Sequence, residues 1–348
     1  MMSELSIEQK QHAIAIAIDS KIKPLGALGE IERLAAKLAL IQSQQEVVDK
    51  IEINKATLLL FAADHGIAQQ GVSIAPSDVT TLMVTQFISG GAAINSFVRV
   101  NEIALHVIDA GMKSPVPEPF INSENFFVQR IGNGTNDFSV EPAMTCAQLD
   151  EALNYGEISF HHAVDNGSNL VLLGEMGIGN TTSAAAILSA ISGLAPQDSV
   201  GRGTGVSEEQ VQLKARLIEQ ALARFEARDA KTVLQQLGGF EIAQMVGVIL
   251  AAEKAQVPVV IDGFIVSSAA LIASKLVPSC LDIMVFAHCS DEKAHQYMLD
   301  EMSAKPLLSL GLRLGEGTGA ALAIPMIRIA ADVYNNMRTF TDLGIELP

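Results

Sequence analysis

Several features of a secreted or membrane protein are missing from this chain of 348 residues. There are only three cysteines, Cys146, Cys280 and Cys289; none forms a C-x-x-C pair, and their odd number fits reduced thiols in a cytoplasm. No uncharged apolar run reaches the roughly 18 residues that suggest a membrane span. No basic segment precedes an apolar one near the N-terminus, as it would in a signal peptide. We therefore expect a cytoplasmic protein.

Positive charge is also scarce. The chain has 23 Lys and Arg against 39 Asp and Glu, which gives a net charge of −16. This balance argues against a nucleic-acid partner or an anionic membrane surface. With 49% hydrophobic and 18% charged residues, the composition is that of a folded globular protein. Such a protein would bind phosphate locally, with backbone amides and a few Lys or Arg side chains.

Short apolar runs alternate with longer segments of helical periodicity. Continuous apolar strands separated by helices are typical of a parallel sheet covered on both faces, so we predict an α/β fold. Ligands bind such sheets at the carboxyl ends of the strands. The predicted strands are Thr57–Ala63, Ile103–Asp109, Phe126–Arg130, Asn169–Gly174, Pro258–Asp262 and Asp282–Phe286. The predicted helices include Ser77–Val98, Cys146–Val164, Ser207–Ala227, Phe240–Lys254 and Ser290–Met302.

Both ends of the chain have a helical pattern. Residues 6–48 look helical with a break at Lys23–Gly29, and residues 318–337 look helical with an interruption at Pro325. A chain of this length can form two domains. We expect residues 1–48 and 325–348 to form a small helical domain, and residues 49–324 to form the large α/β domain.

The most informative segment places one carboxylate among glycines. Glu316 lies between Gly315 and Gly317, just ahead of an Ala-rich apolar run. Glycines let backbone N–H groups approach a ligand, and a helix beginning here would turn its positive end toward an anion. A carboxylate beside an anion site is unfavourable unless it has a task. A general base next to a phosphate-bearing substrate has such a task.

Two further Gly-rich segments fit phosphate binding. Gly174–Thr182 follows an apolar strand and precedes a helix, for which Asn180 or Thr181 is the candidate N-cap. Gly201–Gly205 precedes a helix that carries Lys214. Each segment alone also fits an ordinary glycine turn. Together with the acidic glycine loop, they favour a shared phosphoribosyl site.

Two polar motifs favour structural roles. Asp64 and His65 end the first strand; the pair fits catalysis or substrate positioning, but we prefer the interpretation in which Asp64 caps a loop and orients His65. His288 and His295 match no standard zinc spacing, so no metal site is predicted. Ser290 fits the N-cap of the helix that follows it.

Motifs of two common enzyme classes are missing. Neither Gly-rich loop has the spacing of a dinucleotide fingerprint or a P-loop, which argues against a Rossmann-type dehydrogenase. Ser267 and Ser268 follow a strand without a G-x-S-x-G elbow, which argues against a serine hydrolase.

Six segments, taken together and in order, carry a family resemblance. They are Lys23–Gly29, Ala63–Gly66, Gly174–Thr182, Gly238–Phe240, Asp262–Phe264 and Arg313–Ala321. This set, spread over nearly the whole chain, resembles the nicotinate-nucleotide:dimethylbenzimidazole phosphoribosyltransferase family of cobamide biosynthesis. The resemblance implies a Rossmann-like α/β domain with a six-stranded parallel sheet and a small helical domain from both termini. It also implies a dimer and no metal or organic cofactor.

The resemblance further implies a reaction and its residues. The family transfers phosphoribose from nicotinate mononucleotide to an aromatic base, which releases nicotinate and gives an α-ribotide. Glu316 matches the general base, and Glu175 and Lys214 complete the predicted catalytic set. A carboxylate that removes the proton of the attacking nucleophile typically contributes about 10²–10⁴-fold in rate. The residues predicted to bind the nucleotide and its phosphate are Gly177, Gly179, Asn180, Thr181, Gly203, Ser290, Arg313 and Gly315.

Departures from the family pattern fall in the predicted base pocket, formed by Ala75, Met83, Met176 and Leu314. Benzimidazole-using members tend to carry a hydroxyl at the position of Ala75, a glutamine at Met83 and a leucine at Met176. Two polar groups are thus apolar here, and methionine fits irregular aromatic surfaces. A pocket selects a ring nitrogen strongly only while it keeps polar partners for it. We therefore predict phenol or p-cresol as the favoured base, ahead of dimethylbenzimidazole.

An alternative is a non-catalytic paralogue that stabilises an active partner subunit, because the phenol-activating branch of the family works as paired homologous subunits. The presence of Glu316, Glu175, Lys214 and Arg313 favours an active chain. We expect either a homodimer or a heterodimer with a homologous subunit, and no nucleic-acid or membrane partner.

Overall fold

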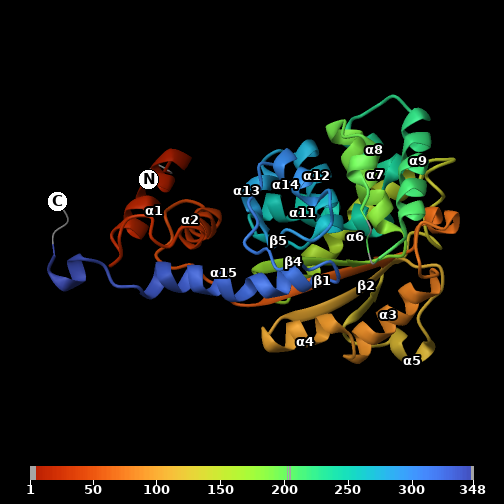
Figure 1. Ribbon diagram of the computed structural model, residues 1–348. Helices are drawn as coiled ribbons and strands as arrows, with labels where there is room; N and C mark the ends of the chain where they lie inside the picture. The colour runs from red at the N-terminus through yellow and green to blue at the C-terminus, as the bar shows by residue number, and fades with distance from the viewer. Residues whose placement is uncertain (1–4, 202, 204, 346–348) are drawn as a thin grey trace.

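A six-stranded parallel sheet forms the centre of the protein (Figure 1). The computed structural model describes residues 5–201, 203 and 205–345. The strands are β1 (Ala56–Ala63), β2 (Ala104–Gly111), β3 (Phe126–Val128), β4 (Leu170–Met176), β5 (Val259–Ile261) and β6 (Met284–Phe286). They lie in the order β3-β2-β1-β4-β5-β6, and every neighbouring pair is parallel. The predicted fold class is confirmed.

Strand β1 illustrates why the strands read as continuous apolar runs. All eight of its residues are buried. Leu59 and Phe61 belong to the hydrophobic cluster on one face of the sheet, whereas Leu58 and Leu60 belong to the cluster on the other. Successive side chains of a strand point to opposite faces, so a strand covered on both faces must be apolar throughout.

Helices cover both faces of this sheet (Figure 1). One layer contains α6 (Cys146–Asp165), α7 (Asn180–Ser192), α9 (Glu208–Ala223), α10 (Ala230–Leu237), α11 (Phe240–Ala255), α12 (Phe264–Leu276) and α14 (His295–Glu301). The other contains α3 (Asp78–Ser89), α4 (Ala93–Val100) and α15 (Thr318–Asn336). Short helical segments are η1 (Gly66–Gln70), α5 (Glu118–Ile121), α8 (Pro196–Ser199), α13 (Cys280–Ile283) and η2 (Thr341–Leu343).

The N-terminal helices pack beside the C-terminal one. Helices α1 (Ile7–Asp19) and α2 (Glu30–Gln42) contact each other, and α2 contacts α15; Figure 1 places α1 and α2 to one side of the sheet. Helix α15 is continuous through Pro325, which the sequence analysis treated as an interruption. Burial of Ile324 and Ile327 stabilises the helix despite the lost N–H donor. The division into two domains remains a prediction.

Most predicted elements differ from the structure by a few residues at their ends, and three of the differences have an identifiable form. The helix predicted for Ser77–Val98 is two helices, because Gly90 adopts a left-handed φ of +85° and ends α3. The helix predicted from Ser290 begins only at His295. The strand predicted from Asp282 begins at Met284, because Asp282 belongs to the short helix α13.

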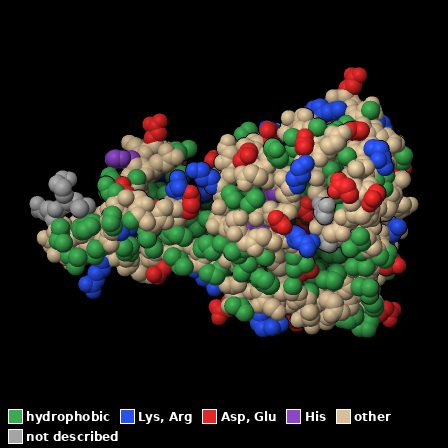
Figure 2. All heavy atoms as spheres, in the orientation of Figure 1, with side chains coloured by type: hydrophobic (Ala, Val, Ile, Leu, Met, Phe, Trp, Pro, Cys, Tyr) green, Lys and Arg blue, Asp and Glu red, His purple; other side chains and the backbone are tan. Residues whose placement is uncertain are grey.

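Over residues 5–201, 203 and 205–345, no helix combines the length and apolar character needed to cross a membrane. On the face seen in Figure 2, Lys and Arg side chains lie scattered, many of them near acidic ones.

Candidate functional site

The sheet reverses its direction of growth between β1 and β4. The chain adds β2 and β3 on one side of β1, then returns to add β4, β5 and β6 on the other side. In doubly wound sheets, ligands bind at the carboxyl ends of the strands beside such a switch point. Asp64 and His65 directly follow β1, and Glu175 lies at the end of β4.

A cavity of about 110 Å³ lies at this edge of the sheet. It brings together ten of the predicted site residues: Glu175, Met176, Gly177, Asn180, Thr181, Gly203, Ser290, Arg313, Leu314 and Gly315. Its other lining residues are Ile178, Asp262, Gly263, Phe264, Ile265, His288 and Glu292. The predicted site residues Ala75, Met83, Gly179, Lys214 and Glu316 lie outside the described lining.

Glu316 lies in an unusual backbone segment beside this cavity. Gly315, Glu316 and Gly317 have φ values of +85°, +63° and +83°, so three consecutive residues are left-handed. This conformation is costly for a residue with a Cβ, and such strain concentrates at functional sites. The Glu316 side chain is 4% exposed, and its Oε2 accepts a hydrogen bond of 3.3 Å from the Ile94 amide at the start of α4. Burial and the nearby Asp262 raise its pKa, which the Ile94 bond partly opposes.

Asp262 occupies the place at which the sequence analysis expected a bound anion. Its Oδ2 accepts from the Gly317 amide at 3.2 Å, and its Oδ1 accepts from the Ala320 amide at 2.8 Å. The positive end of α15 therefore faces a carboxylate of the protein, not a phosphate. Burial raises the pKa of Asp262 to about 7, although its backbone hydrogen bonds oppose that rise.

Glu175 lies close to Gly315, the residue that precedes Glu316 in the same loop. Its Oε2 accepts from Asn180 Nδ2, and a Cβ on Gly315 would collide with its Oε1. Burial, followed by the charges of Asp262 and Glu241, raises the pKa of Glu175 to about 8. A carboxyl group with that pKa is mostly protonated at neutral pH. The site therefore contains a protonated Glu175 near Glu316, the predicted base.

The turn between β4 and α7 is held by internal hydrogen bonds. The Asn180 amide donates to the Gly177 carbonyl at 3.2 Å, and the Thr182 amide donates to the Gly179 carbonyl at 3.0 Å. The N-cap of α7 is Gly179, with φ +100°, and not Asn180 or Thr181 as predicted. Among the described residues, no acceptor bonds the amides of Gly179 and Thr181. These amides are therefore available to an anionic ligand.

Two cationic side chains contact residues that line the cavity. Lys214 on α9 is 3% exposed, and its Nζ donates to Thr181 Oγ1 at 3.3 Å. Arg313 Nη1 donates to the Gly203 carbonyl at 3.4 Å. Burial lowers the pKa of Lys214, and the charge of Glu292 opposes that change. Arg202 and Thr204 of the predicted glycine loop lie outside the described residues.

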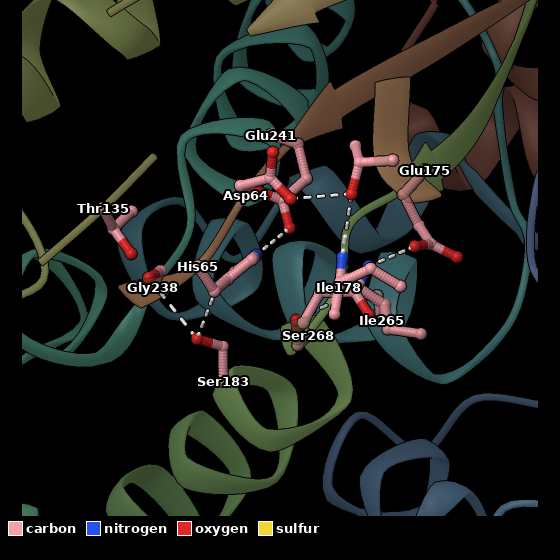
Figure 3. A network of polar contacts seen from close by, with 12 residues as sticks. Asp64, His65, Thr135, Glu175, Ile178, Ser183, Gly238, Glu241, Ile265 and Ser268 are labelled. Atoms are coloured by element: carbon pink, nitrogen blue, oxygen red, sulfur yellow. Dashed lines mark hydrogen bonds and ion pairs between the residues drawn. The ribbon is translucent and has the colours of Figure 1, made fainter. Parts of the chain in front are cut away.

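A network of buried polar side chains lies next to the turn between β4 and α7 (Figure 3). His65 Nε2 lies 2.6 Å from Glu241 Oε1, and His65 Nδ1 lies 3.1 Å from Ser183 Oγ. The Ser183 hydroxyl donates to the Leu237 carbonyl at 2.8 Å, so it accepts from His65 Nδ1–H. His65 Nε2 and Glu241 then share one proton between them.

Glu241, not Asp64, contacts and orients His65, so that half of the predicted role of Asp64 is wrong, whereas its predicted role in capping a loop agrees with its bond to the Lys113 amide. Asp64 instead accepts from Thr80 Oγ1 at 2.7 Å and from the Lys113 amide at 2.7 Å. The Thr80 oxygen in turn accepts from the Ile178 amide at 3.3 Å. The sequence analysis missed Glu241, whose signal was an acidic residue in the first turn of a largely apolar helix.

Near the cavity, the His295 ring makes structural hydrogen bonds. His295 Nδ1 accepts from the Ser290 amide at 2.8 Å, so its Nε2–H faces Ser267 Oγ at 2.9 Å. Burial lowers the pKa of His295 to about 3, which keeps the ring neutral. Ser290 thus lines the cavity and is not the predicted N-cap. Within the described ranges, no cluster of three or more His, Cys, Asp or Glu is arranged to hold a metal ion.

Comparison with known proteins agrees with this architecture. A family model described as "Phosphoribosyltransferase" matches residues 5–345. The fold and the site therefore define the chain as a phosphoribosyltransferase, that is, a pentosyltransferase. Relatives named nicotinate-nucleotide–dimethylbenzimidazole phosphoribosyltransferase are similar over nearly their whole length. The Vibrio parahaemolyticus relative is 51% identical over 338 residues, 95% of this chain and 97% of its own.

A second relative and a solved structure extend the match. The Shewanella piezotolerans relative is 50% identical over 341 residues, 97% of each chain. The crystal structure of CobT from Thermus thermophilus has a TM-score of 0.92 at 37% identity, and covers 97% of this chain and 99% of its own. The chain belongs to the nicotinate-nucleotide–dimethylbenzimidazole phosphoribosyltransferase family. The resemblance found in the sequence is confirmed.

Proposed function

We propose that this chain transfers the 5-phosphoribosyl group of nicotinate mononucleotide to an aromatic base. The products are nicotinate and an α-riboside phosphate for the cobamide nucleotide loop. The main support is the loop that holds the buried Glu316 carboxylate beside a cavity that Arg313 lines and whose lining residue Thr181 is bonded by Lys214. The names of the relatives agree with nicotinate mononucleotide as donor.

The site residues have distinct roles in this proposal. Lys214, Arg313 and the amides of Gly179 and Thr181 bind the phosphate, because they are the donors near the cavity. Glu316 accepts the proton of the attacking base, directly or through a water. The remaining predicted nucleotide contacts, from the Gly-rich turn and Ser290, position the ribose.

The reaction needs little help for its leaving group. The glycosylated ring nitrogen of nicotinate is cationic, and it becomes neutral when its bond to the anomeric carbon breaks. The bond that forms joins this carbon to the nucleophile, whose proton passes to Glu316. The raised pKa of Glu316 makes it a stronger base than an exposed glutamate.

For the acceptor, we propose phenol or p-cresol ahead of dimethylbenzimidazole. Met176 and Leu314 line the cavity. Met83 and Met176 pack against the same hydrophobic cluster. Met83 also lies one helical turn beyond Thr80, which bonds the Ile178 amide of the β4–α7 turn. An apolar pocket wall of this kind offers no partner to a ring nitrogen but accommodates a phenolic ring.

A competition assay tests this acceptor preference. Purified protein is given nicotinate mononucleotide with dimethylbenzimidazole, adenine, phenol and p-cresol together, and the products are identified by mass spectrometry. Predominant phenyl or cresyl ribotide supports the proposal. Equal or better use of dimethylbenzimidazole, with no turnover of phenol, contradicts the preference but not the phosphoribosyl transfer itself.

Matched variants test the pocket residues. Ala75→Ser combined with Met83→Gln restores two polar groups, so we expect a relative shift toward dimethylbenzimidazole of about 10-fold or more. Leu82→Gln is the control, because Leu82 lies on the same helix but is 63% exposed. An equal shift in both variants would argue against a role for Ala75 and Met83.

We also propose that the chain works as a dimer, with itself or with a homologous subunit. Light scattering and activity of the purified chain test this together. An inactive chain that becomes active only with a homologous subunit would favour the non-catalytic alternative. The presence of the acidic and cationic residues around one cavity supports an active chain.

A further inference from the structure

We infer that Asp262 is a positioning residue that acts through Glu316, by anchoring the loop that carries it and by placing a second negative charge beside it. The inference rests on the proposed role of Glu316 as the base. Asp262 follows β5 directly and is 1% exposed. Strand β5 is paired on both sides, with β4 and β6, so this residue is attached to a rigid part of the sheet.

The anchoring has a defined geometry. One oxygen of Asp262 accepts from the Gly317 amide, the residue after Glu316, and the other accepts from the Ala320 amide. Because these bonds fix the first turn of α15, they also fix the direction in which the loop enters it. The carboxylate supplies the acceptor that the exposed amides of a helix start require.

Neighbouring groups leave the loop little room to move. A Cβ on Gly174 would lie 2.7 Å from the Glu316 carbonyl oxygen, so β4 lies directly against the loop. A Cβ on Gly319 would collide with the His288 ring. The left-handed φ of Glu316 is thus maintained by contacts on two sides and by the hydrogen bonds of Asp262.

The charge of Asp262 acts on the same carboxylate. The titratable groups that interact with Asp262 and Glu316 are Glu175 on β4 and His288, whose Nε2 lies 3.7 Å from Asp262 Oδ1. Burial lowers the pKa of His288, so this ring does not neutralise Asp262 at neutral pH. Asp262, whose own pKa burial raises to about 7, is partly ionised at neutral pH, and that charge adds to burial in raising the pKa of Glu316.

Asp262→Asn is the principal test, with Asp262→Ser as a second variant that keeps an acceptor for the helix start but has no charge. Asp229→Asn is the matched control: Asp229 caps α10 by accepting from the Thr232 amide at 3.0 Å, and it is exposed. For each variant, the measurements are kcat, KM for nicotinate mononucleotide, the pH profile of kcat/KM between pH 5 and 9, and the melting temperature.

For Asp262→Asn we expect kcat to fall by about 10- to 100-fold, because a displaced base loses much of its effect. We expect the acid limb of the profile to move down by about 1 pH unit, because a nearby negative charge has been removed. KM should change little, and Asp229→Asn should keep the wild-type profile. Asp262→Ser should move the limb in the same direction as Asp262→Asn.

Two results would overturn the inference. One is a lower melting temperature in both Asp262 variants with an unmoved acid limb, which indicates a structural role alone. The other is failure of both variants to fold, which has the same meaning. A Glu316→Gln protein measured in parallel separates the proposals: if it keeps wild-type turnover, the assignment of the base is wrong, and the role of Asp262 is wrong with it.

Discussion

Gly174 of β4 lies against the backbone of Glu316, so closely that a Cβ on Gly174 would come within 2.7 Å of the Glu316 carbonyl oxygen and 2.9 Å of the Gly317 amide nitrogen. Contacts this short require one of the partners to shift. Here both partners are backbone, in a buried strand and in a left-handed loop. Strand β4 therefore determines how closely the loop that carries Glu316 can approach the sheet.

Gly174→Ala should consequently displace the loop and lower kcat. A misplacement of about 1 Å can cost about 100-fold in rate, and we expect a loss of that order in steady-state assays. Gly132→Ala is the control, since its Cβ would make only an ordinary contact of 3.4 Å with the Phe240 ring. Wild-type kcat in Gly174→Ala would mean that the position of the loop does not limit turnover.

Glu316→Gln should separate chemistry from folding. The glutamine retains an oxygen that can accept from the Ile94 amide, so the loop should keep its structure. It cannot accept the proton of the nucleophile, and we expect kcat to fall by about 10²-fold or more. Binding of nicotinate mononucleotide, measured by calorimetry, should stay near the wild-type value. Turnover within a few-fold of wild type would show that another group is the base.

Glu175 should make the stability of the protein depend on pH. Its pKa is raised from 4.5 to about 8 in the folded state. Between about pH 4.5 and 8, the folded protein therefore keeps a proton on Glu175 that the unfolded chain loses. The free energy of unfolding should decrease as the pH rises through this range. Melting temperatures of Glu175→Gln should fall less over this range than those of the wild type. Parallel curves for the two proteins would contradict the raised pKa.

The pair formed by His65 and Glu241 should matter for stability more than any surface ion pair. Both side chains are fully buried. Removal of one partner leaves the other unpaired, which typically costs about 3–5 kcal/mol in the free energy of unfolding. We expect His65→Ala and Glu241→Ala each to lose that amount in urea titrations, and the double variant to lose less than their sum.

An exposed ion pair supplies the control for this cycle. Lys231 Nζ lies 2.8 Å from Asp150 Oδ1, with side chains 55% and 60% exposed. Such pairs contribute about 0–1 kcal/mol. Additive losses for His65 and Glu241 would mean that the two residues stabilise the fold independently.

The sequence predicted most of the sheet because buried parallel strands have an unmistakable apolar pattern. All six strands occur where they were expected, with bounds that differ by a few residues. The sequence also identified the segments around Glu175, Lys214 and Glu316, because a glycine next to a polar residue is a pattern of adjacent residues that needs no structure to be recognised. The cavity joins many of these segments at one edge of the sheet.

What the sequence did not predict depends on contacts between distant segments. The bonds from Asp262 to the start of α15 join residues 55 and 58 positions apart. His65 and Glu241 are 176 positions apart. Periodicity and spacing report on neighbours within one element, so an acid that caps another helix looks like any acid after a strand.

At the end of β4, two neighbouring residues serve opposite faces of the sheet, so the site depends on the exact length of this strand. Gly174 belongs to the side of the sheet where α15 packs, and Glu175, the next residue, points to the side of α7. The acidic loop crosses the edge of the sheet between them. Inserting or deleting a single residue in β4 would exchange the two positions, placing a carboxylate where only a hydrogen fits and a hydrogen where a carboxylate is required. The site can therefore tolerate some substitutions, but a change in the length of β4 would destroy it.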